Sequence, residues 1–374
     1  MAKAVYVGVG SKARKMKKAY IGIGGKARKV KKMYIGVGGK ARLCYSAELE
    51  KVGMATALST TRYDMRAATV GKYALFAGGY ISKSSFGYGV SSSVDAYNTS
   101  LTKSTPTELS CKRCGHAAAS VGGYALFAGG ASSYNILGFY DDIVGSVDAY
   151  NASLTRSAAH IFGDTAAIGG AAVGNYALFA GGTWDSQISE DNVISSVLAY
   201  DPSLTFTIAP DLSVARADVK GASVGNYALF AGGKASSKCT TVDAYNASLT
   251  RTTATALSSV ENNSAAATVG NHAIFVGNTA SADIYDASLT KTSAAILSTA
   301  RTGLAATTVG DYAIFSGGGV ADFCDASLTR SSIGTSMTGY DMGAATIGDY
   351  ALFAGGHSDK NSDTAYDSVE VYTA

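Results

Sequence analysis

The sequence Tyr73-Ala-Leu-Phe-Ala-Gly-Gly79 returns, little changed, through most of the chain. Further copies begin at Tyr124, Tyr176, Tyr227, His272, Tyr312 and Tyr350. Successive copies start 38 to 52 residues apart, a spacing that accommodates a unit of about four strands. Because seven copies share one pattern, most of the 374 residues belong to a single repeated architecture.

Each copy is flanked by further strand patterns. A short run such as Ala265 to Val269 precedes it and ends in a Val-Gly or Ile-Gly turn, which predicts a tight hairpin. A third pattern follows at a variable distance, and in the first repeat it is SVDAYNTSLT, Ser93 to Thr102. Its apolar and polar residues alternate as in a strand, and the Asn-x-Ser or Asp-x-Ser that follows predicts a turn. A fourth run, beginning at Lys103 in the first repeat, contains Pro106, as an edge strand can.

This order of elements resembles the kelch repeat: strand, tight turn, strand ending in Gly-Gly, loop, strand with a Tyr, and strand, with an Arg shortly before the next repeat. The resemblance covers residues from about 54 to 374. It implies an all-β protein, a seven-bladed kelch-like β-propeller. The chain departs from the family because the Trp of the last kelch strand is missing, and the single Trp184 lies in a predicted loop.

The two ends of the repeat region predict how the ring closes. The last repeat stops at Ala374, directly after its third strand, whereas Met54 to Leu58 has the pattern of a fourth strand with no repeat before it. We therefore expect the N-terminal strand to complete the last blade and remove the open sheet edges. The predicted domains are a docking segment, residues 1–47, and a propeller, residues 48–374.

Composition narrows the class of protein. Hydrophobic residues make up 47% of the chain, charged residues 16%, and there are 44 Gly, which suits small residues packed near a propeller axis. No apolar run approaches membrane length and the first residues lack a signal-peptide core, so we expect neither a membrane span nor general secretion. Five unevenly spaced Cys indicate a reducing compartment better than a disulfide framework.

Residues 1–47 contain a different, fourteen-residue repeat that starts at Tyr6, Tyr20 and Tyr34. Each unit has an alternating apolar half and a basic half, joined by Gly-Gly-Lys or Gly-Ser-Lys, which predicts small repeated hairpins. Of the 31 Lys and Arg, 13 lie at or before Arg42, and the rest of the chain then holds 18 basic against 28 acidic residues. The segment is therefore basic and the propeller acidic.

Three functions compete for this segment. It could be a solvated basic arm, although disorder would not need the alternation. It could contact nucleic acid through its charge, although the aromatic partners would be few, and nucleic acid is not the expected partner. The favoured alternative is docking to a protein assembly by strand pairing, because such short hairpins need partners. The expected docking residues are Tyr6, Tyr20, Tyr34, Lys26 and Arg28.

Residues 3–43 also resemble N-terminal segments of tail and baseplate proteins of phages, and of phage-derived particles, that target Gram-positive bacteria. The motif is of low complexity. The resemblance implies attachment to a virion, with other tail proteins as partners and a homo-oligomeric assembly. The expected location is then the tail or another surface-exposed part of a virion made in the bacterial cytoplasm.

The loops between the second and third strands of each repeat indicate the functional face. They are long in the first, second, third and seventh repeats, which are neighbours in a closed ring, whereas the turns at the opposite end hardly vary. Aromatic planes with carboxylates are typical of carbohydrate sites, although about half of these aromatics could simply pack their own loops. The candidate ligand-binding residues are Phe86, Tyr88, Tyr134, Tyr140, Trp184 and Asp185.

A set of arginines, Arg62, Arg113, Arg216 and Arg301, recurs eight residues before the first-strand Val. Arg at this point of a kelch-like repeat is commonly structural, through pairing with backbone or carboxylates. If the side chains faced the channel mouth they would suit an acidic sugar or a phosphate. We therefore add these four residues to the candidate ligand-binding set and leave both roles open.

Catalysis finds little support in the sequence. The four His occupy different repeat elements and predict no metal cluster, and the ligand set of a copper-radical oxidase is not visible. Cys111 and Cys114 form a C-x-x-C without a second pair at zinc spacing. No Asp-box repeats of a sialidase occur. We expect no cofactor, no metal and no catalytic residue.

The sequence thus favours a non-enzymatic binding module, a phage or phage-like tail protein that recognises a bacterial surface glycan through its long-loop face. Oligomeric display would multiply weak single sites. Two alternatives stay open. One is an intracellular kelch-like protein-interaction propeller, and the other is a glycan-cleaving enzyme that uses loop carboxylates.

Overall fold

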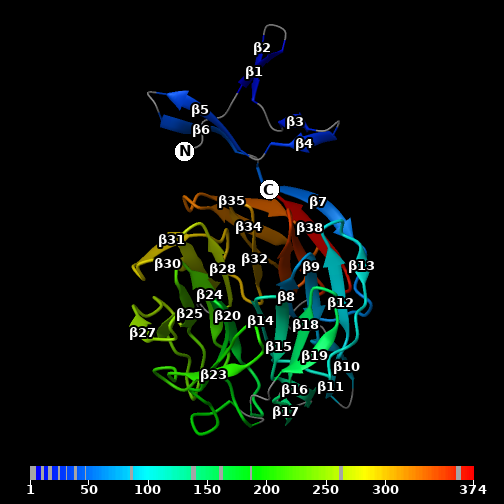
Figure 1. Cartoon of the computed structure of the whole chain (residues 1–374), viewed down its shortest axis with the longest axis vertical. Coiled ribbons are helices and arrows are strands. Elements are labelled where there is room, and N and C mark those ends of the chain that lie inside the picture. Colours follow the sequence, from blue (N-terminus) through cyan, green and yellow to red (C-terminus); the bar gives the residue numbers. More distant parts are fainter. Residues whose placement is uncertain are drawn as a thin grey trace.

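The computed structural model describes the chain apart from residues 1–5, 10–11, 16–18, 24–25, 31, 38–39, 47, 85–86, 136–139, 160–162, 186–187, 261–263 and 359–363. The described part is all-β, with antiparallel sheets throughout (Figure 1). Among these residues there is no helix long and apolar enough to cross a membrane.

Seven of the described sheets share one four-stranded meander, and we call them the repeat sheets. Their strands are β8 (Arg66–Val70), β9 (Tyr73–Ala77), β12 (Val94–Asn98) and β13 (Lys103–Ser104); β14 (Ala117–Val121), β15 (Tyr124–Ala128), β18 (Val147–Asn151) and β19 (Arg156–Ala159); β20 (Gly169–Val173), β21 (Tyr176–Ala180), β22 (Val197–Tyr200) and β23 (Phe206–Ala209); β24 (Lys220–Val224), β25 (Tyr227–Ala231), β26 (Val242–Asn246) and β27 (Arg251–Ala254); β28 (Ala265–Val269), β29 (His272–Gly277), β30 (Thr279–Asp286) and β31 (Lys291–Ala295); β32 (Ala305–Val309), β33 (Tyr312–Gly317), β34 (Val320–Asp325) and β35 (Arg330–Gly334); and β36 (Gly343–Ile347), β37 (Tyr350–Ala354), β38 (Val369–Thr373) and β7 (Glu50–Ala55).

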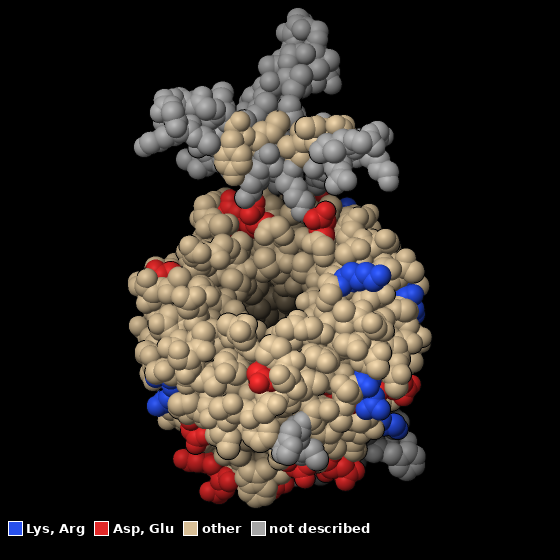
Figure 2. Space-filling view, in the orientation of Figure 1, with Lys and Arg blue, Asp and Glu red and all other residues tan. Residues whose placement is uncertain are grey.

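The repeat sheets stand side by side around a central opening (Figure 2). Their innermost strands contact one another in the order β8, β14, β20, β24, β28, β32, β36 and back to β8. Hydroxyl groups cross these contacts, since Ser120 Oγ donates to the carbonyl of Thr69 at 2.7 Å and Ser223 Oγ to that of Ala172 at 2.6 Å. The architecture is therefore β-propeller-like, as the sequence predicts.

The two faces of each repeat sheet differ, and the difference packs the sheets together. Phe76 and Tyr97 lie on one face of the first sheet and join a buried cluster with Leu352 of the seventh. Leu75 and small residues lie on the other face and join a cluster with Phe127 and Tyr150 of the second sheet. Because neighbours cover both faces, Ala74 to Ala77 are all fully buried, whereas half-buried strands would alternate.

The Gly-Gly pair ends the second strand at a crowded point. Gly78 and Gly79 have φ of 65° and 94°, in the region that disfavours side chains. A Cβ on Gly78 would lie 2.6 Å from the carbonyl oxygen of Arg113 in the next repeat. The repeated glycines thus allow the chain of one repeat sheet to approach its neighbour closely.

The turns at the opposite end have the predicted chemistry. Asn98 Oδ1 accepts hydrogen bonds from the N–H groups of Ser100 and Thr102, at 2.9 and 3.0 Å. Leu101 takes a positive φ of 60° to close the turn, as its counterparts do in five other repeats. The side-chain acceptor therefore fixes the turn, in agreement with the Asn-x-Ser pattern.

The N-terminal strand of the repeat region lies slightly earlier than predicted. Met54 to Leu58 was the expected segment, whereas β7 runs from Glu50 to Ala55 and pairs with β38. Lys51 reaches from β7 to the buried carboxylate of Glu370 and forms an ion pair with it. This pairing joins residues more than 300 positions apart, and the register shift between Val371 and Tyr372 accommodates Gly53 at a φ of 136°.

Residues before β7 form three separate hairpins, which project from the end of the molecule near β7 and β35 (Figure 1). They are β1 (Tyr6–Val9) with β2 (Lys12–Lys15), β3 (Tyr20–Ile23) with β4 (Lys26–Lys29), and β5 (Lys32–Val37) with β6 (Lys40–Ser46). Each fourteen-residue unit therefore forms one hairpin, and each of these sheets has only two described strands.

Two predicted loops contain strands of their own. Segments β10 (Tyr80–Ser84) and β11 (Gly87–Val90) come from the first repeat, and β16 (Ala131–Tyr134) and β17 (Tyr140–Ile143) come from the second. They join through one pair, Tyr88 with Tyr134, into a four-stranded sheet that we call the loop sheet. The long loops of two repeats are therefore organised as one unit.

Candidate ligand-binding face

A tight corner precedes the innermost strand in the six repeats whose corner is described, and it positions the charged groups of this face. The corner residues Asp64, Gly115, Ala167, Asp218, Gly303 and Asp341 all have φ between 50° and 65°. Backbone N–H groups of the corners donate to the corner before them, as Asp64 does to Asp341 at 2.6 Å and Asp218 to Ala167 at 2.8 Å. The carboxylates of three repeats are thereby held at one level of the ring.

Each corner carboxylate has a basic partner. Asp64 pairs with Arg66 at 2.5 Å, Asp218 with Lys234 at 3.2 Å, and Asp341 with the imidazole of His357 at 3.0 Å. Burial raises the pKa of the Asp64 carboxyl, an effect that Arg66 opposes and Asp341 reinforces. We call this set, together with Lys220, the charged mouth.

The arginines predicted from the sequence do not belong to the charged mouth. Arg62, Arg113 and Arg216 are fully buried between repeat sheets, and each pairs with an Asp of a third strand. Arg216, for example, lies 2.9 Å from Asp243 and also donates to the carbonyls of Gly232 and Phe230. The expected ligand-binding role of these three is corrected to a structural one, because their guanidinium groups face protein on all sides.

Arg301 follows the same pattern with slightly more exposure, and it pairs with the buried Asp322. Sequence reasoning did not predict the carboxylate partners of these arginines, although the sequence held a signal for them. The partners are Asp95, Asp148, Asp243 and Asp322. The third repeat has Thr165 in place of the Arg and Leu198 in place of the Asp. In this repeat both charges are absent together, whereas the seventh repeat has Gly339 in place of the Arg and its buried Glu370 pairs with Lys51 instead.

The aromatic residues of the loop sheet pack against one another. The ring of Tyr134 lies 5.1 Å from that of Tyr80, 5.4 Å from Tyr88 and 5.2 Å from Tyr140. Burial raises the pKa of Tyr134 to about 12. Tyr88, Tyr134 and Tyr140 therefore form a half-buried cluster. Their rings pack within the loops that carry them, which is the alternative role considered for the loop aromatics.

Two other predicted residues, Trp184 and Asp185, are neighbours in the third repeat. The Trp184 side chain is 54% exposed, as an open stacking surface requires. Asp185 is half-buried beside it and accepts a hydrogen bond from Asn192 Nδ2 at 3.2 Å. Phe86, also predicted for this face, lies outside the described residues.

The Cys and His residues occupy separate environments. Cys114 is buried, donates to the carbonyl of Ala131, and has its pKa raised by burial to about 12. His116 is buried with both ring nitrogens unpaired among the described residues, and burial holds its pKa well below 6.5. In the part of the chain that is described, no group of three or more His, Cys, Asp or Glu could hold a metal ion.

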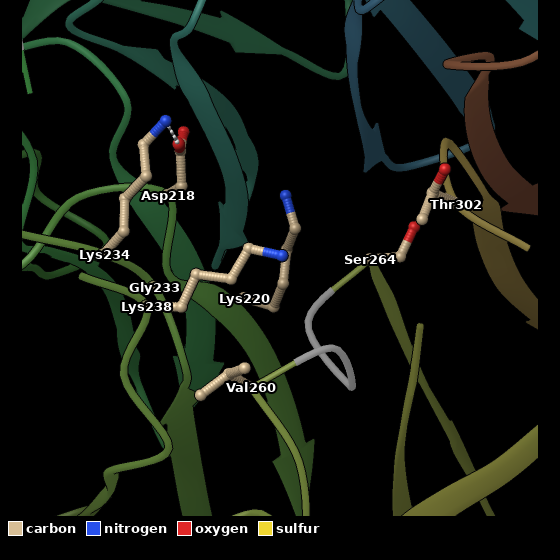
Figure 3. A pocket seen from close by; sticks show the side chains of 8 residues that line it. All are labelled: Asp218, Lys220, Gly233, Lys234, Lys238, Val260, Ser264 and Thr302. Carbon is tan, nitrogen blue, oxygen red and sulfur yellow. Dashed lines mark ion pairs between the residues drawn. The ribbon is translucent and has the colours of Figure 1, made fainter. Parts of the chain in front are cut away.

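A pocket of about 270 Å³ opens beside the charged mouth, between the fourth, fifth and sixth repeats (Figure 3). The described part of its walls carries three lysines, one carboxylate and two hydroxyls, together with a comparable amount of apolar surface. The lining residues are Asp218, Lys220, Gly233, Lys234, Lys238, Val260, Ser264 and Thr302. Sequence reasoning missed this pocket because the fifth and sixth repeats have short loops.

Comparison with known proteins gives a likeness in fold only. No protein-family model matches the chain, and no curated protein matches it. A solved structure titled "Structure of YjhT" superposes with a TM-score of 0.54 at 12% identity, over 86% of this chain and 99% of that chain. The architecture is therefore similar to that of YjhT, and at this identity the similarity extends to the fold alone.

Replacing Arg216 by Met should lower the free energy of unfolding by about 3 kcal/mol, because it leaves the Asp243 carboxylate buried without its main cation. Urea unfolding measures the loss. Combining Arg216→Thr with Asp243→Leu copies the natural pair of the third repeat and should recover much of it. A double variant as unstable as Arg216→Met would contradict the compensation.

Replacing His116 by Met, the residue at this position in two other repeats, should change the pH dependence of stability. In the folded protein the imidazole stays neutral, whereas in the unfolded chain it binds a proton below about pH 6.5. Stability is therefore full above pH 6.5 and falls on acidification, by up to about 1.4 kcal/mol per pH unit. Urea unfolding between pH 7.5 and 5 should show a shallower decline for His116→Met, and equal slopes would contradict this account.

Proposed function

We propose that the chain is a seven-bladed, kelch-like β-propeller, closed by its N-terminal strand, that acts as a non-enzymatic binding module. Support for closure comes from β7 as the outer strand of the last repeat sheet and from the cluster that joins the seventh sheet to the first. A closed ring is a rigid scaffold, on which variable loops can be held for recognition.

The ligand that fits this face best is a bacterial surface glycan. The observation that carries this proposal is the exposed indole of Trp184 beside Asp185, on the face that also bears the loop sheet and the charged mouth. An indole plane offers C–H stacking to a sugar ring, and neighbouring carboxylates and amides accept and donate hydrogen bonds to hydroxyls. The tyrosines of the loop sheet pack against one another, so we do not assign them to the sugar.

The N-terminal hairpins would attach the module to a phage or phage-like tail. Tyr34 and Ile21 are more than half exposed, so their apolar surface is available to a partner. Two-stranded hairpins are marginal on their own, and strand pairing with another tail protein or with further copies of the chain would complete them. The side chains of Tyr6, Tyr20, Lys26 and Arg28 lie outside those described, and their docking role stays a prediction.

A second candidate is glycan cleavage, and one observation favours it. Burial raises the pKa of the Asp64 carboxyl, and the charge of Asp341 in the neighbouring corner reinforces the shift. A carboxyl group with a raised pKa near a second carboxylate can act as the general acid of a glycosidase. Product analysis of any bound glycan distinguishes the two functions. Hydrolysis that disappears in Asp64→Asn would replace the binding proposal by an enzymatic one.

Trp184→Ala should weaken glycan binding at least about tenfold, because stacking on an aromatic plane contributes on the order of 1 to 2 kcal/mol. The measurement is a glycan array with residues 48–374, followed by titration of the best neutral glycan. Ile208→Ala, which alters a similarly exposed apolar residue on the outer strand β23, is the matched control. Binding that both variants retain in full would rule out the Trp184 surface.

Removal of residues 1–43 should abolish attachment to tails while leaving glycan binding unchanged. The test is to purify tailed particles from the source and to probe them for the full-length and the truncated chain. The full-length chain should copurify with tails and the truncated chain should stay free. A full-length chain found only free of particles would refute the virion proposal and favour an interaction partner elsewhere.

A further inference from the structure

The contact between the seventh and first repeat sheets, which we call the seam, carries the same three residues twice. Tyr63-Asp64-Met65 and Tyr340-Asp341-Met342 occupy equivalent places, each with its Asp at the corner. In the other described corners the preceding residue is Cys, Ala or Thr. The two copies lie side by side, because the N–H of Asp64 donates to the carbonyl of Asp341 at 2.6 Å. The seam therefore brings two Tyr-Asp pairs to the charged mouth.

The polar groups of the seam are held in place by the protein itself. Arg66 pairs with Asp64 Oδ1 at 2.5 Å, and its Nε donates to a backbone carbonyl of the second repeat at 2.9 Å. His357 Nε2 lies 3.0 Å from Asp341 Oδ2, and the backbone of His357 pairs with that of Tyr340 in both directions. The two carboxylates are thus positioned before any ligand arrives, which lowers the entropic cost of binding.

Each carboxylate keeps one oxygen for a ligand. Among the described residues, neither Asp64 Oδ2 nor Asp341 Oδ1 has a hydrogen-bond partner, and the two side chains are 28% and 42% exposed. Within the same part of the chain, Arg66 Nη2 and the Tyr340 hydroxyl also have no partner, so both can donate. The seam therefore offers two acceptors and two donors at the rim of the opening.

Aromatic rings stand beside these polar groups. The centroid of the His357 imidazole lies 4.7 Å from that of Tyr63 and 6.2 Å from that of Tyr340. His357 is buried, whereas both tyrosines stay partly exposed. Rigid aromatic surface next to hydrogen-bonding groups suits a sugar, because the rings contact its C–H groups while the polar atoms bind its hydroxyls.

The charge balance of the mouth indicates which sugars fit. Asp64 pairs with Arg66, the corner carboxylate of the fourth repeat pairs with Lys234, and Lys220 acts on both Asp64 and Asp341. The three carboxylates of the charged mouth thus face three cationic side chains in addition to His357. Such a surrounding gives no advantage to an anion or a cation, whereas a hydroxyl group can both donate to it and accept from it.

We propose that the seam is a second saccharide subsite, which binds neutral sugar units. The free oxygens of Asp64 and Asp341 accept from sugar hydroxyls, Arg66 donates to a sugar oxygen, and the two tyrosines contact C–H groups. Two like Tyr-Asp pairs side by side suit two successive units of a linear chain. The inference rests on the proposed glycan-binding function, to which it adds a second contact point besides Trp184, and two contact points hold a long polysaccharide more firmly than one.

The test is calorimetric titration of the full-length protein with neutral tetrasaccharides, namely cellotetraose, maltotetraose and an N-acetylglucosamine tetramer. Trp184→Ala serves as the background, so that the remaining binding reports on the seam. We expect at least one tetrasaccharide to bind this variant. Its affinity should change little between low and high salt, because a neutral ligand neutralises no charge.

Adding Asp341→Ala to Trp184→Ala should weaken the remaining binding about tenfold or more, because a hydrogen bond to a charged group is lost. Ala167 holds the same corner in the third repeat at a φ of 56°, so the fold should accept the change. The matched control is Asp218→Ala, which removes an ion-paired corner carboxylate that follows an Ala instead of a Tyr. Urea unfolding of both variants checks the fold. Should Asp341→Ala fail to fold, Tyr340→Ala, with the same expected loss of binding, decides instead.

Failure of this inference is distinguishable from failure of the proposed function. If every tetrasaccharide that binds the unaltered protein is lost in Trp184→Ala and kept in Asp341→Ala, the seam subsite is overturned and the Trp184 surface stands. Equal losses in Asp341→Ala and Asp218→Ala would also overturn the seam subsite, since the Tyr-Asp pairs would then have no special role. If no tetrasaccharide binds and the glycan array is empty as well, both proposals fall together.

Discussion

The packing of unlike sheet faces is the interaction on which the rest of the structure depends. Each repeat sheet offers a face with a Phe to the sheet before it and a face with Leu or Ile and Ala to the sheet after it, as Phe127 and Leu75 illustrate. A Tyr accompanies the Phe in every repeat sheet except the sixth, where Cys324 takes its place. Such a contact is heterologous, so it propagates from one repeat to the next, and residues of the seventh sheet pack in the same way against the first. The large rings meet small side chains, which lets neighbouring sheets pack closely around a narrow opening. The Phe and Tyr rings of one sheet also contact each other edge to face, as Phe76 and Tyr97 do with centroids 5.9 Å apart. This contact fixes the orientation of both rings.

Buried ion pairs position particular segments within this apolar framework, whereas the framework itself is stabilised by hydrophobic packing. Asp243 accepts from Arg216 within the wall and from the backbone N–H of Ser213, and it therefore ties a connecting segment to a third strand. The third repeat shows that the ring tolerates the loss of such a pair when both members change, since Thr165 and Leu198 replace them. Hydrophobic packing thus stabilises every interface, whereas the ion pairs position particular segments, among them the corners that precede the charged mouth.

Much of this architecture could be predicted from the sequence, because strand periodicity and turn chemistry are local. Tyr73–Ala77, the Asn98 turn and the pairing of an N-terminal strand with the last repeat all follow from short patterns. The loop sheet could not be predicted, since its two halves come from different repeats and meet through the single pair of Tyr88 and Tyr134. The pocket beside the charged mouth depends on ring geometry, which brings Lys220, Ser264 and Thr302 together from three repeats. The repeated arginines, Arg216 among them, could be recognised in the sequence. Whether their side chains face a ligand or the protein interior could be decided only from the structure.

The corner that precedes each innermost strand also limits which charges this face can display. A positive φ favours Gly, Asn and Asp, and the described corners carry Asp, Gly and Ala. The innermost ring of side chains can therefore change readily between acidic and neutral, but hardly to basic. On the innermost strands, positive charge stands two positions later, where Arg66 and Lys220 begin β8 and β24. Backbone geometry at the corners thus favours acidic or neutral side chains at this entrance, and the basic side chains that pair with them come from other positions, such as Arg66 and Lys234.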